Sequence, residues 1–445
     1  MKVTFIMPAI GKKSDEPYVR SWQMEPLAIA VLCAYTPSKV ERCFYDDRLE
    51  PINYDDDTDL VAINVETYTA YRAYQIAKQY QQKNVPVVMG GFHPTMVPDE
   101  VENYADAIVV GEAEGVWEQL LKDAAAGTLK KRYQAPCRPS LTNIAPDRSI
   151  FQNKKYIPLT LMETGRGCCY SCNFCSISAF YGKTHNCRPV ESIIQEIKTA
   201  SKKNIFFIDD NIAMNASYSK QLFKALIPLK KRWVSQISIN LACDQELVSL
   251  MQKSGCAGVL IGFESLEEDN LAAMHKGINT KEDVYEKGLQ RLRQAGLAVY
   301  GTFVFGYDAD TEKTFEKTLA FAKRHRFFLT AFNHLVPFPG TPLYKELKQE
   351  GRLIYDKWWL NPEYRFGQLV FNPRHMKAET LANRCEAYRH KFYSFSSIMY
   401  RAMDLKANLR SFPLALIYFT QNFMARREVA LRQNLPLGNR EEYHA

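Results

Sequence analysis

The sequence predicts an α/β protein with two parallel-sheet units in series and a helical region after them. Three observations support this: short apolar runs alternate with helical patterns in two separate series, a proline-containing stretch without periodicity lies between the series, and helical spacing dominates the final part of the chain. We expect a first domain over residues 1–130, a linker over 131–157, a second domain over 158–355 and a helical C-terminal region over 356–445.

The first series has the pattern of a flavodoxin-like, or Rossmann-like, domain. Such alternation indicates a parallel sheet with helices on both faces, and ligands of this architecture bind at the carboxyl ends of the strands. The strand candidates are residues 3–7, 40–45, 60–64, 85–89 and 107–110, and the helical patterns lie near 26–35, 69–83 and 114–125.

The second series predicts an incomplete TIM-type barrel of six βα units, (βα)6, in which functional loops again follow the strands. Its strand candidates are residues 158–163, 205–208, 237–241, 258–262, 298–305 and 331–336. Its helical patterns lie near 190–202, 215–229, 244–253, 280–295 and 312–324.

The composition is that of an ordinary globular protein, with 46% hydrophobic and 24% charged residues among 445. The net charge of +8 permits anionic partners but does not demand nucleic acid. Eleven cysteines, an odd and scattered set, are poor material for a disulfide framework and favour a reducing compartment. The first residues are too short and too soon interrupted by proline for a signal peptide, and no apolar run approaches the roughly 20 residues of a membrane span, so we expect a cytoplasmic protein.

Three cysteines carry the most specific chemical signal. Cys168, Cys172 and Cys175 have the spacing Cys-x3-Cys-x2-Cys directly after the first strand candidate of the second series. Three thiolates so close together can hold three irons of a cubane cluster and leave the fourth iron without a protein ligand. Zinc is the alternative metal, but a closed zinc site needs a fourth ligand nearby. Cys169 is an extra thiol that the spacing does not require, and it fits best as a bystander in the loop.

This spacing, with the aromatic Phe174 just before the last cysteine, resembles the radical S-adenosylmethionine (SAM) superfamily. The resemblance implies a [4Fe–4S] cluster on the three cysteines and SAM chelated to the open iron. It also implies an external electron donor, such as a flavodoxin or ferredoxin, and cleavage of SAM to a 5′-deoxyadenosyl radical.

Further loops match the superfamily in order and imply SAM contacts. The stretch Asp209-Asp-Asn211 stands where the superfamily often has Gly-Gly-Glu, and Gly262-Phe-Glu-Ser265 resembles the Gly-x-Glu-Ser of cobalamin-type members. Two alternatives stay open, namely that Asp209 caps the next helix and that Glu264 forms a buried structural ion pair. The implied contacts to SAM are Phe174, Asp210, Asn211, Glu264, Ser265, Gly306 and Val336.

In the first domain, Gly90-Gly-Phe-His-Pro-Thr95 directly follows one strand candidate, and Val109-Val-Gly-Glu-Ala113 comes at the next. With these two loops in order, the domain resembles the cobalamin (B12)-binding domain found ahead of many radical SAM enzymes. Glycines at strand ends let a bulky planar ligand approach the backbone closely. The chain lacks the Asp-x-His motif that supplies a cobalt ligand in mutases, so His93 also fits as an ordinary loop histidine. The candidate cobalamin loops contain Gly90, Gly91, His93 and Gly111.

The C-terminal region predicts helices near 377–402 and 403–432, with apolar residues recurring every three or four positions. Residues 401–432 hold six basic and two acidic side chains. Packing on the barrel is the simpler interpretation, and peripheral contact with a membrane, which would suit a lipid substrate, is the alternative.

The resemblance as a whole implies a radical SAM transferase acting on a small molecule or lipid, with methyl transfer through cobalamin or related C–C bond chemistry. Two rival functions remain open at this point. One is transfer of the 3-amino-3-carboxypropyl group of SAM to trivalent arsenic, as in arsinothricin biosynthesis, for which the adjacent thiols of Cys168 and Cys169 would suit a thiophilic ion. The other is a non-catalytic iron–sulfur or cobalamin sensor.

Overall fold

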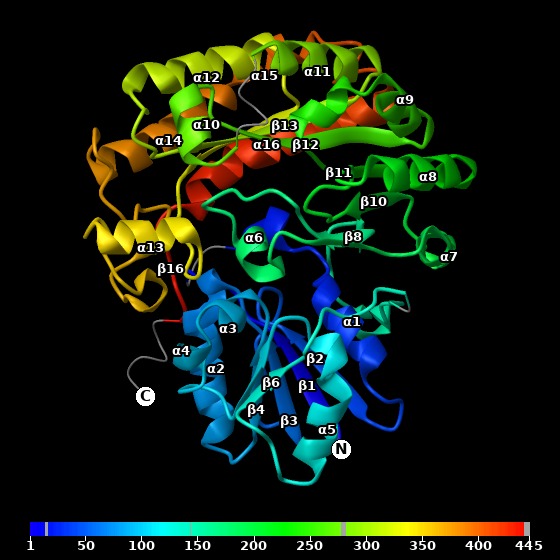
Figure 1. Cartoon of the computed structure of the whole chain (residues 1–445), viewed down its shortest axis with the longest axis vertical. Coiled ribbons are helices and arrows are strands. Elements are labelled where there is room, and N and C mark those ends of the chain that lie inside the picture. The colour runs from blue at the N-terminus through cyan, green and yellow to red at the C-terminus, as the bar shows by residue number, and fades with distance from the viewer. Residues whose placement is uncertain (14–16, 143, 277–281, 440–445) are drawn as a thin grey trace.

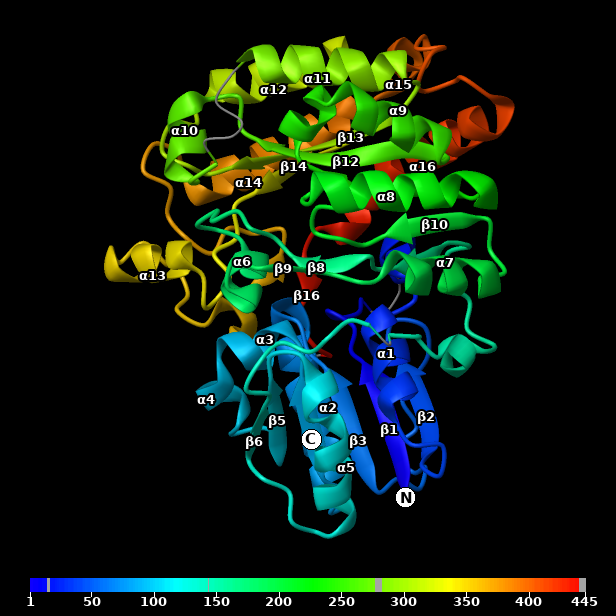
Figure 2. The ribbon, with the colours of Figure 1, turned by 45° about the vertical axis from the view of Figure 1, so that its right-hand side comes forward.

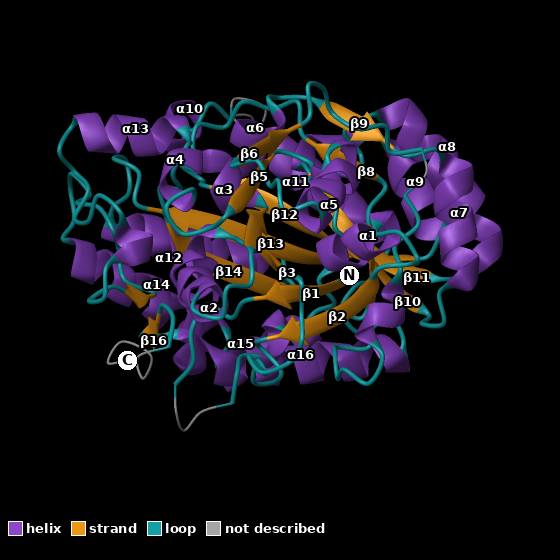
Figure 3. Ribbon diagram, turned by 90° about the horizontal axis from the view of Figure 1, so that it is seen from below, coloured by secondary structure: helices purple, strands orange, loops and turns teal. Residues whose placement is uncertain are grey.

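The computed structural model describes all residues of the chain except 14–16, 143, 277–281 and 440–445. Two six-stranded parallel sheets follow each other along the long axis of the molecule, with the N-terminal unit below and the second unit above in Figure 1. Seen from below, the strands of both sheets run through the middle and most helices lie around them (Figure 3). The α/β class and the two units in series are confirmed.

The first sheet has the strand order β2-β1-β3-β4-β5-β6, which is the flavodoxin-like order with one strand added at the edge. Every neighbouring pair is parallel. Its central strands are buried on both faces, as helix-covered parallel strands should be. The elements are β1 (Lys2–Met7), α1 (Leu27–Tyr35), β2 (Glu41–Asp46), β3 (Leu60–Asn64), α2 (Ala70–Gln81), β4 (Val87–Gly90), α3 (Phe92–Met96), α4 (Pro98–Val101), β5 (Ala107–Val110), α5 (Trp117–Ala125) and β6 (Arg132–Gln134).

The second sheet has the order β14-β13-β12-β11-β10-β7, again parallel throughout. Spatial order equals chain order, and β7 and β14 stand at opposite edges, so this is the expected open (βα)6 barrel. The elements are β7 (Thr160–Met162), α7 (Val190–Thr199), β10 (Asn204–Phe207), α8 (Ala216–Leu226), β11 (Arg232–Ile237), α9 (Gln245–Lys253), β12 (Cys256–Glu264), α10 (Glu268–Ala273), α11 (Glu282–Gln294), β13 (Ala298–Phe305), α12 (Glu312–Arg324), β14 (Leu329–His334) and α13 (Pro342–Gln349).

Two sequence predictions are wrong in detail, and a third lies partly outside the described residues. The third barrel strand is β11 (Arg232–Ile237), and the predicted residues 237–241 run mainly into a 3-10 turn, Ile239–Cys243. The stretch 237–241 alternates apolar and polar residues, whereas 232–237 does not, yet the earlier stretch takes the place between β10 and β12. The linker contains β6, which extends the first sheet. The helix expected at 280–295 is described only from Glu282, because 280 and 281 lie outside the described residues.

The C-terminal region contains α14 (Ala378–Phe392), α15 (Phe395–Ala402) and α16 (Phe412–Arg432), with breaks at 393–394 and 403–411 that the sequence did not predict. After α16, β16 (Leu435–Pro436) pairs with β15 (Arg365–Phe366), and Gly438 bridges to Gly11 of the first unit. The chain end thus ties the barrel to the N-terminal unit. A search of the described helices finds none with the length and apolar content to cross a bilayer.

Candidate functional site

The three cysteines lie in a loop whose two ends are fastened by a short antiparallel ribbon. Strand β8 (Gly165–Gly167) pairs with β9 (His185–Cys187), and the intervening chain contains the cysteines and helix α6 (Ser176–Tyr181). Gly167 has φ +93°, and a Cβ there would stand 2.1 Å from the carbonyl oxygen of Thr184. Only glycine fits where the chain passes so close to Thr184, so Gly167 at the end of β8 allows the ribbon to close the loop. Figure 2 shows α6, β8 and β9 between the two sheets.

The thiols of Cys168, Cys172 and Cys175 are close enough to affect one another's ionisation. Burial raises the pKa of Cys168 to about 11, and the other two thiols add to the effect. Burial also raises the pKa of Cys175, opposed by the backbone N–H groups of Ile177 and Ser178 at the start of α6. Deprotonation by a bound metal is what converts such thiols into ligands. Residue types, loop and proximity therefore fit a three-thiolate cluster, although within the described part of the chain no three His, Cys, Asp or Glu side chains already converge as a metal site.

Asn173 fastens the cysteine loop to the barrel. Its side-chain oxygen accepts a hydrogen bond from the hydroxyl of Tyr307 at 2.7 Å, and its Nδ2 donates to the carbonyl of Ala273 at 3.0 Å. Its backbone N–H donates to Met274 O at 3.2 Å. These contacts connect the loop to the end of α10 and to Tyr307, which lies just after β13. Phe174 next to it packs on the barrel core.

The carboxylates after β10 divide into one that faces the loop and one that does not. Asp210 accepts the N–H of Gly167 at 2.9 Å, burial raises its pKa to about 6, and it raises the pKa values of Cys168 and Cys175. Asp209 binds the hydroxyl and N–H of Thr164 instead, so the interpretation of Asp209 as a helix cap is wrong.

Asn211 is 2% exposed and fully engaged in the local turn. It donates to Ser238 Oγ at 3.0 Å and accepts from the N–H of Ala213 at 3.3 Å. The cap of α8 is Asn215, whose side chain accepts from Tyr218 N–H. Of the Asp209-Asp-Asn211 stretch, Asp210 alone lies towards the cysteines.

Glu264 ends β12 in a strained conformation and forms a buried ion pair. Its φ is +64°, where the β12–β13 register shifts, and its carboxylate lies 2.6 Å from Nζ of Lys276. Lys276 also donates to Gly262 O at 2.9 Å. Burial raises the pKa of the Cys172 thiol, and the Lys276 ammonium opposes this. The pair therefore stands beside the cysteine loop, and backbone strain of this kind is typical of functional sites.

The other predicted SAM contacts are placed less favourably for a ligand. Ser265 is buried and its hydroxyl accepts from Glu267 N–H and Asn270 Nδ2, which organises the start of α10. Gly306 has φ +128° and donates its N–H to Asp310 at 2.7 Å. Val336 packs against the apolar cluster of the first unit.

The glycine loop after β4 lies against the cysteine loop. Helix α3 begins there and contacts α6, where the rings of Phe92 and Phe180 are 4.6 Å apart. Gly91 has φ +114°, and a Cβ would clash with Asn64 and Val65. Gly111 after β5 has φ +81° and open space where a Cβ would stand, which suits close approach of a flat ligand. The first-unit loops and the cysteines thus face one region between the sheets.

His93 lies away from that region. It is fully buried, with its ring nitrogens 3.1 Å from the Tyr74 hydroxyl, 3.4 Å from Glu100 and 3.3 Å from Thr67. Desolvation lowers its pKa, so the ring stays neutral. This histidine is a satisfied core residue of α3, while Gly90, which ends β4, keeps its place at the strand end.

A buried charge cluster joins the two units beside the site. Arg166, in β8, donates to Glu163 at 2.7 and 3.0 Å, to Glu112 at 3.0 Å and to Glu114 at 2.6 Å. All four side chains are 6–11% exposed. Arg138 reaches the same Glu112 at 2.7 Å. Arg166 and Glu112 are about fifty residues apart in the sequence, so no local pattern predicts that they are in contact. The contacts of Lys276 with Glu264 and of Asn173 with Tyr307 could not be predicted for the same reason.

Comparison with known proteins identifies the family. Residues 162–322 match the model of the radical SAM superfamily. Bacteriochlorophyllide d C-12(1)-methyltransferase of Chlorobaculum tepidum is 33% identical over 380 residues, which are 83% of this chain and 80% of that protein. The chain belongs to the radical SAM superfamily. It is accordingly an enzyme and a transferase, which uses a [4Fe–4S] cluster and SAM.

Two solved radical SAM structures share the fold at low identity. The cobalamin-dependent SAM radical enzyme OxsB, with aqua-cobalamin and SAM bound, aligns with a TM-score of 0.67 and 13% identity over 97% of this chain and 72% of its own. The methyltransferase TsrM from Kitasatospora setae, with cobalamin and a [4Fe–4S] cluster bound, aligns with a TM-score of 0.64 and 17% identity over 78% of each chain. Both alignments extend over more than the barrel, so this radical SAM chain shares the two-unit arrangement.

Proposed function

We propose that this radical SAM enzyme transfers a methyl group to an unactivated carbon of a small-molecule substrate with the help of cobalamin. The observation that carries the proposal is the contact of the glycine loop after β4 with the cysteine loop, through α3 and α6. A ligand at the carboxyl ends of the first sheet would therefore stand next to the cluster. The similarity to a bacteriochlorophyllide methyltransferase and to two cobalamin-bound enzymes supports the same reaction class.

In this proposal Cys168, Cys172 and Cys175 hold the cluster, and SAM completes its coordination. When bound, the cluster supplies the electron that cleaves SAM, and cobalamin carries the methyl group. The loop anchors keep the thiols in place, because Asn173 connects them to the barrel and Gly167 closes the ribbon.

The remaining contacts follow from position. Asp210 and Glu264 are the acidic side chains at the strand ends nearest the cysteines, so we assign them to the amino and hydroxyl groups of SAM. Gly306 and Val336 would line the adenine only through their backbone, because the side chain of Val336 packs within the fold, and Gly90, Gly91 and Gly111 would border the corrin. We leave out Ser265, Asn211 and His93, because their polar atoms are used within the fold.

The partners of the reaction belong to the same proposal. An external electron donor, such as a flavodoxin or ferredoxin, would reduce the cluster, and the substrate would be a small molecule or a lipid. The barrel and α14, which packs along β14, would shape its pocket.

The test is an absorption spectrum of anaerobically reconstituted protein, with and without hydroxocobalamin, followed by analysis of the SAM-derived products. We expect cluster absorption in both samples, corrin bands that co-elute with the protein, and 5′-deoxyadenosine as product. Methylthioadenosine would instead indicate transfer of the aminocarboxypropyl group. Cluster absorption without retained corrin would contradict the cobalamin assignment.

A further inference from the structure

The exposed apolar side chains in the described part of this protein are concentrated in one segment of the chain. Nine of the fourteen large hydrophobic side chains that are exposed in the described chain fall between residues 395 and 423. We call their most prominent members the apolar face: Phe395, Met399, Met403, Leu405, Phe412 and Leu416, each between 43% and 83% exposed. They come from α15, α16 and the connection between them, which projects at the upper right edge in Figure 2. Contiguous exposed apolar surface of this kind marks an interaction site.

The elements that carry the apolar face are held in a defined position, because buried polar groups on their opposite side bind them to the barrel. Arg401 is fully buried and donates to the carbonyl of Phe327 at 2.8 Å and to Asn422 Oδ1 at 2.9 Å. The helices α15 and α16 pack on each other through Ile398 and Tyr418. These helices therefore have a well-packed inner side, and the apolar side chains of the apolar face are left over on the outer side.

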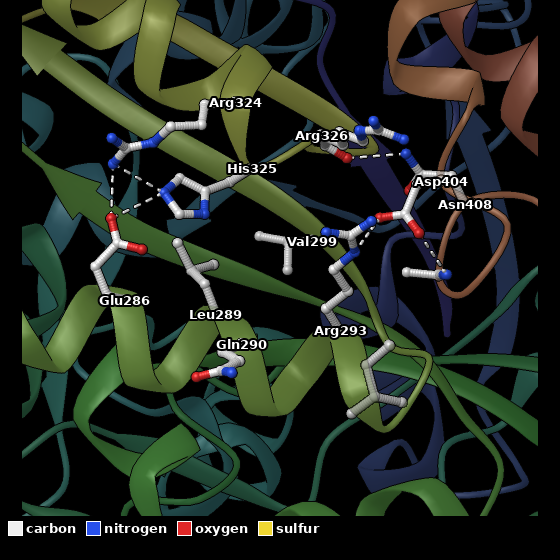
Figure 4. A pocket seen from close by; sticks show the side chains of 12 residues that line it. Glu286, Leu289, Gln290, Arg293, Val299, Arg324, His325, Arg326, Asp404 and Asn408 are labelled. Carbon is white, nitrogen blue, oxygen red and sulfur yellow. Dashed lines mark hydrogen bonds and ion pairs between the residues drawn. The ribbon is translucent and has the colours of Figure 1, made fainter.

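The connection between the helices is held in the same way. Asp404 accepts the N–H groups of Lys406 and Ala407 and lies 3.0 Å from Arg293, while Asn408 donates to Arg326 O at 2.8 Å. Figure 4 shows these groups turned towards one another along a pocket of about 580 Å³. Met403 and Leu405, which flank Asp404, are 58% and 71% exposed. Because Asp404 and Asn408 hold the connection to the barrel, Met403 and Leu405 are left exposed to solvent.

The exposed charges within the segment that carries the apolar face are of one sign. Between residues 391 and 427 every exposed charged side chain is basic, namely Lys391, Lys406, Arg410, Arg426 and Arg427. The acid within this stretch, Asp404, and the one just after it, Glu428, are each 2% exposed and paired with arginines. Protruding apolar side chains with a basic rim have the chemistry of a surface that binds anionic lipid headgroups.

We infer that the apolar face docks the protein on the surface of an anionic phospholipid bilayer. A lipid surface fits better than a protein partner, because these side chains protrude from a helix pair and a connecting loop, and every exposed charge of residues 391–427 is basic. The docking surface lies at the amino ends of β13 and β14, next to Gly296 and Arg326, whereas the cysteines lie at the carboxyl ends of the barrel strands. Docking therefore holds the enzyme at the bilayer and leaves the entrance to the cluster facing away from it.

Co-sedimentation of the full reconstituted chain with vesicles tests this inference. Wild type should bind vesicles of 70% phosphatidylcholine and 30% phosphatidylglycerol at least tenfold more tightly than pure phosphatidylcholine, and 0.5 M salt should weaken the binding. The double variant Leu405→Ser/Phe412→Ser should lose at least tenfold, and Lys406→Glu/Arg426→Glu should lose the preference for phosphatidylglycerol. The matched control Ile227→Ser/Ile354→Ser removes exposed apolar side chains elsewhere and should bind as wild type does.

Melting temperature and SAM cleavage, measured on all variants, separate lost docking from lost folding. Because the face lies away from the cysteines, both should stay unchanged. Absence of vesicle binding by wild type, or equal loss in the control, would overturn the inference. Sedimentation velocity adds one more decisive outcome: a dimer that the Leu405→Ser/Phe412→Ser change dissociates, without vesicle binding, would assign the face to a second copy of this chain.

Discussion

Replacing Arg166 by methionine should weaken the joint between the two units and thereby the cysteine loop. Arg166 makes four hydrogen bonds of 2.6–3.0 Å to three carboxylates, and all of these side chains are 6–11% exposed. Removing one partner of a buried ion pair leaves uncompensated charge and costs about 3–5 kcal/mol. For a cooperative unit of 150–250 residues this corresponds to a fall of about 6–20 °C in Tm.

The assay is differential scanning fluorimetry of wild type and variant at pH 8. The control is Arg132→Met, which removes a pair with Asp99 and Glu102 whose arginine is 40% exposed and should cost under about 1 kcal/mol. Equal small losses of Tm in both variants would refute the reasoning.

Three further predictions concern the cluster, the strand-end pair and pH. Cys172→Ala should abolish iron retention and SAM cleavage, whereas Cys169→Ala should keep both; iron analysis and 5′-deoxyadenosine formation decide, and an active Cys172→Ala protein would contradict the ligand assignment. Glu264→Gln leaves the buried ammonium of Lys276 without its ion-pair partner and should cost about 3 kcal/mol of stability. The double variant Glu264→Gln/Lys276→Met should regain most of that stability but not SAM binding. Tight SAM binding by the double variant would contradict a contact between Glu264 and SAM. Burial lowers the pKa of His334 to about 4. As pH falls from 6.5 towards 4, His334 therefore takes up a proton in the unfolded chain but not in the folded chain, and the free energy of unfolding should fall by at most about 3 kcal/mol. Thermal denaturation of His334→Gln should show a flatter pH dependence, and an unchanged slope would contradict this prediction.

Most strands of both sheets could be predicted because parallel strands buried on both faces are short apolar runs with helical patterns between them. Strand β13 (Ala298–Phe305) and helix α12 (Glu312–Arg324) coincide with their predicted ranges. The strand at 232–237 could not be separated from its neighbour 237–241 by pattern alone. Its Ser235 is buried and donates to Phe207 O, a contact that only the assembled sheet provides.

The site was predictable as a motif and less so as an arrangement. Cysteine spacing and loop order are local properties, so the loops that face each other could be named from the sequence. The partners of Arg166, Lys276 and Asn173 could not, because each contact joins segments from different strand ends. His93 is a residue that the sequence named as a candidate and the structure places elsewhere. It follows a glycine loop, but its ring is buried in the core against Tyr74 and Glu100.

Electron paramagnetic resonance of the reduced, reconstituted protein tests the central assignment most directly. With Cys168, Cys172 and Cys175 as the protein ligands, one iron remains available to SAM. The account predicts about four irons per chain and a cluster signal whose g values shift when SAM is added. A cluster signal that SAM leaves unchanged, or a triple-alanine variant that retains its iron, would contradict it.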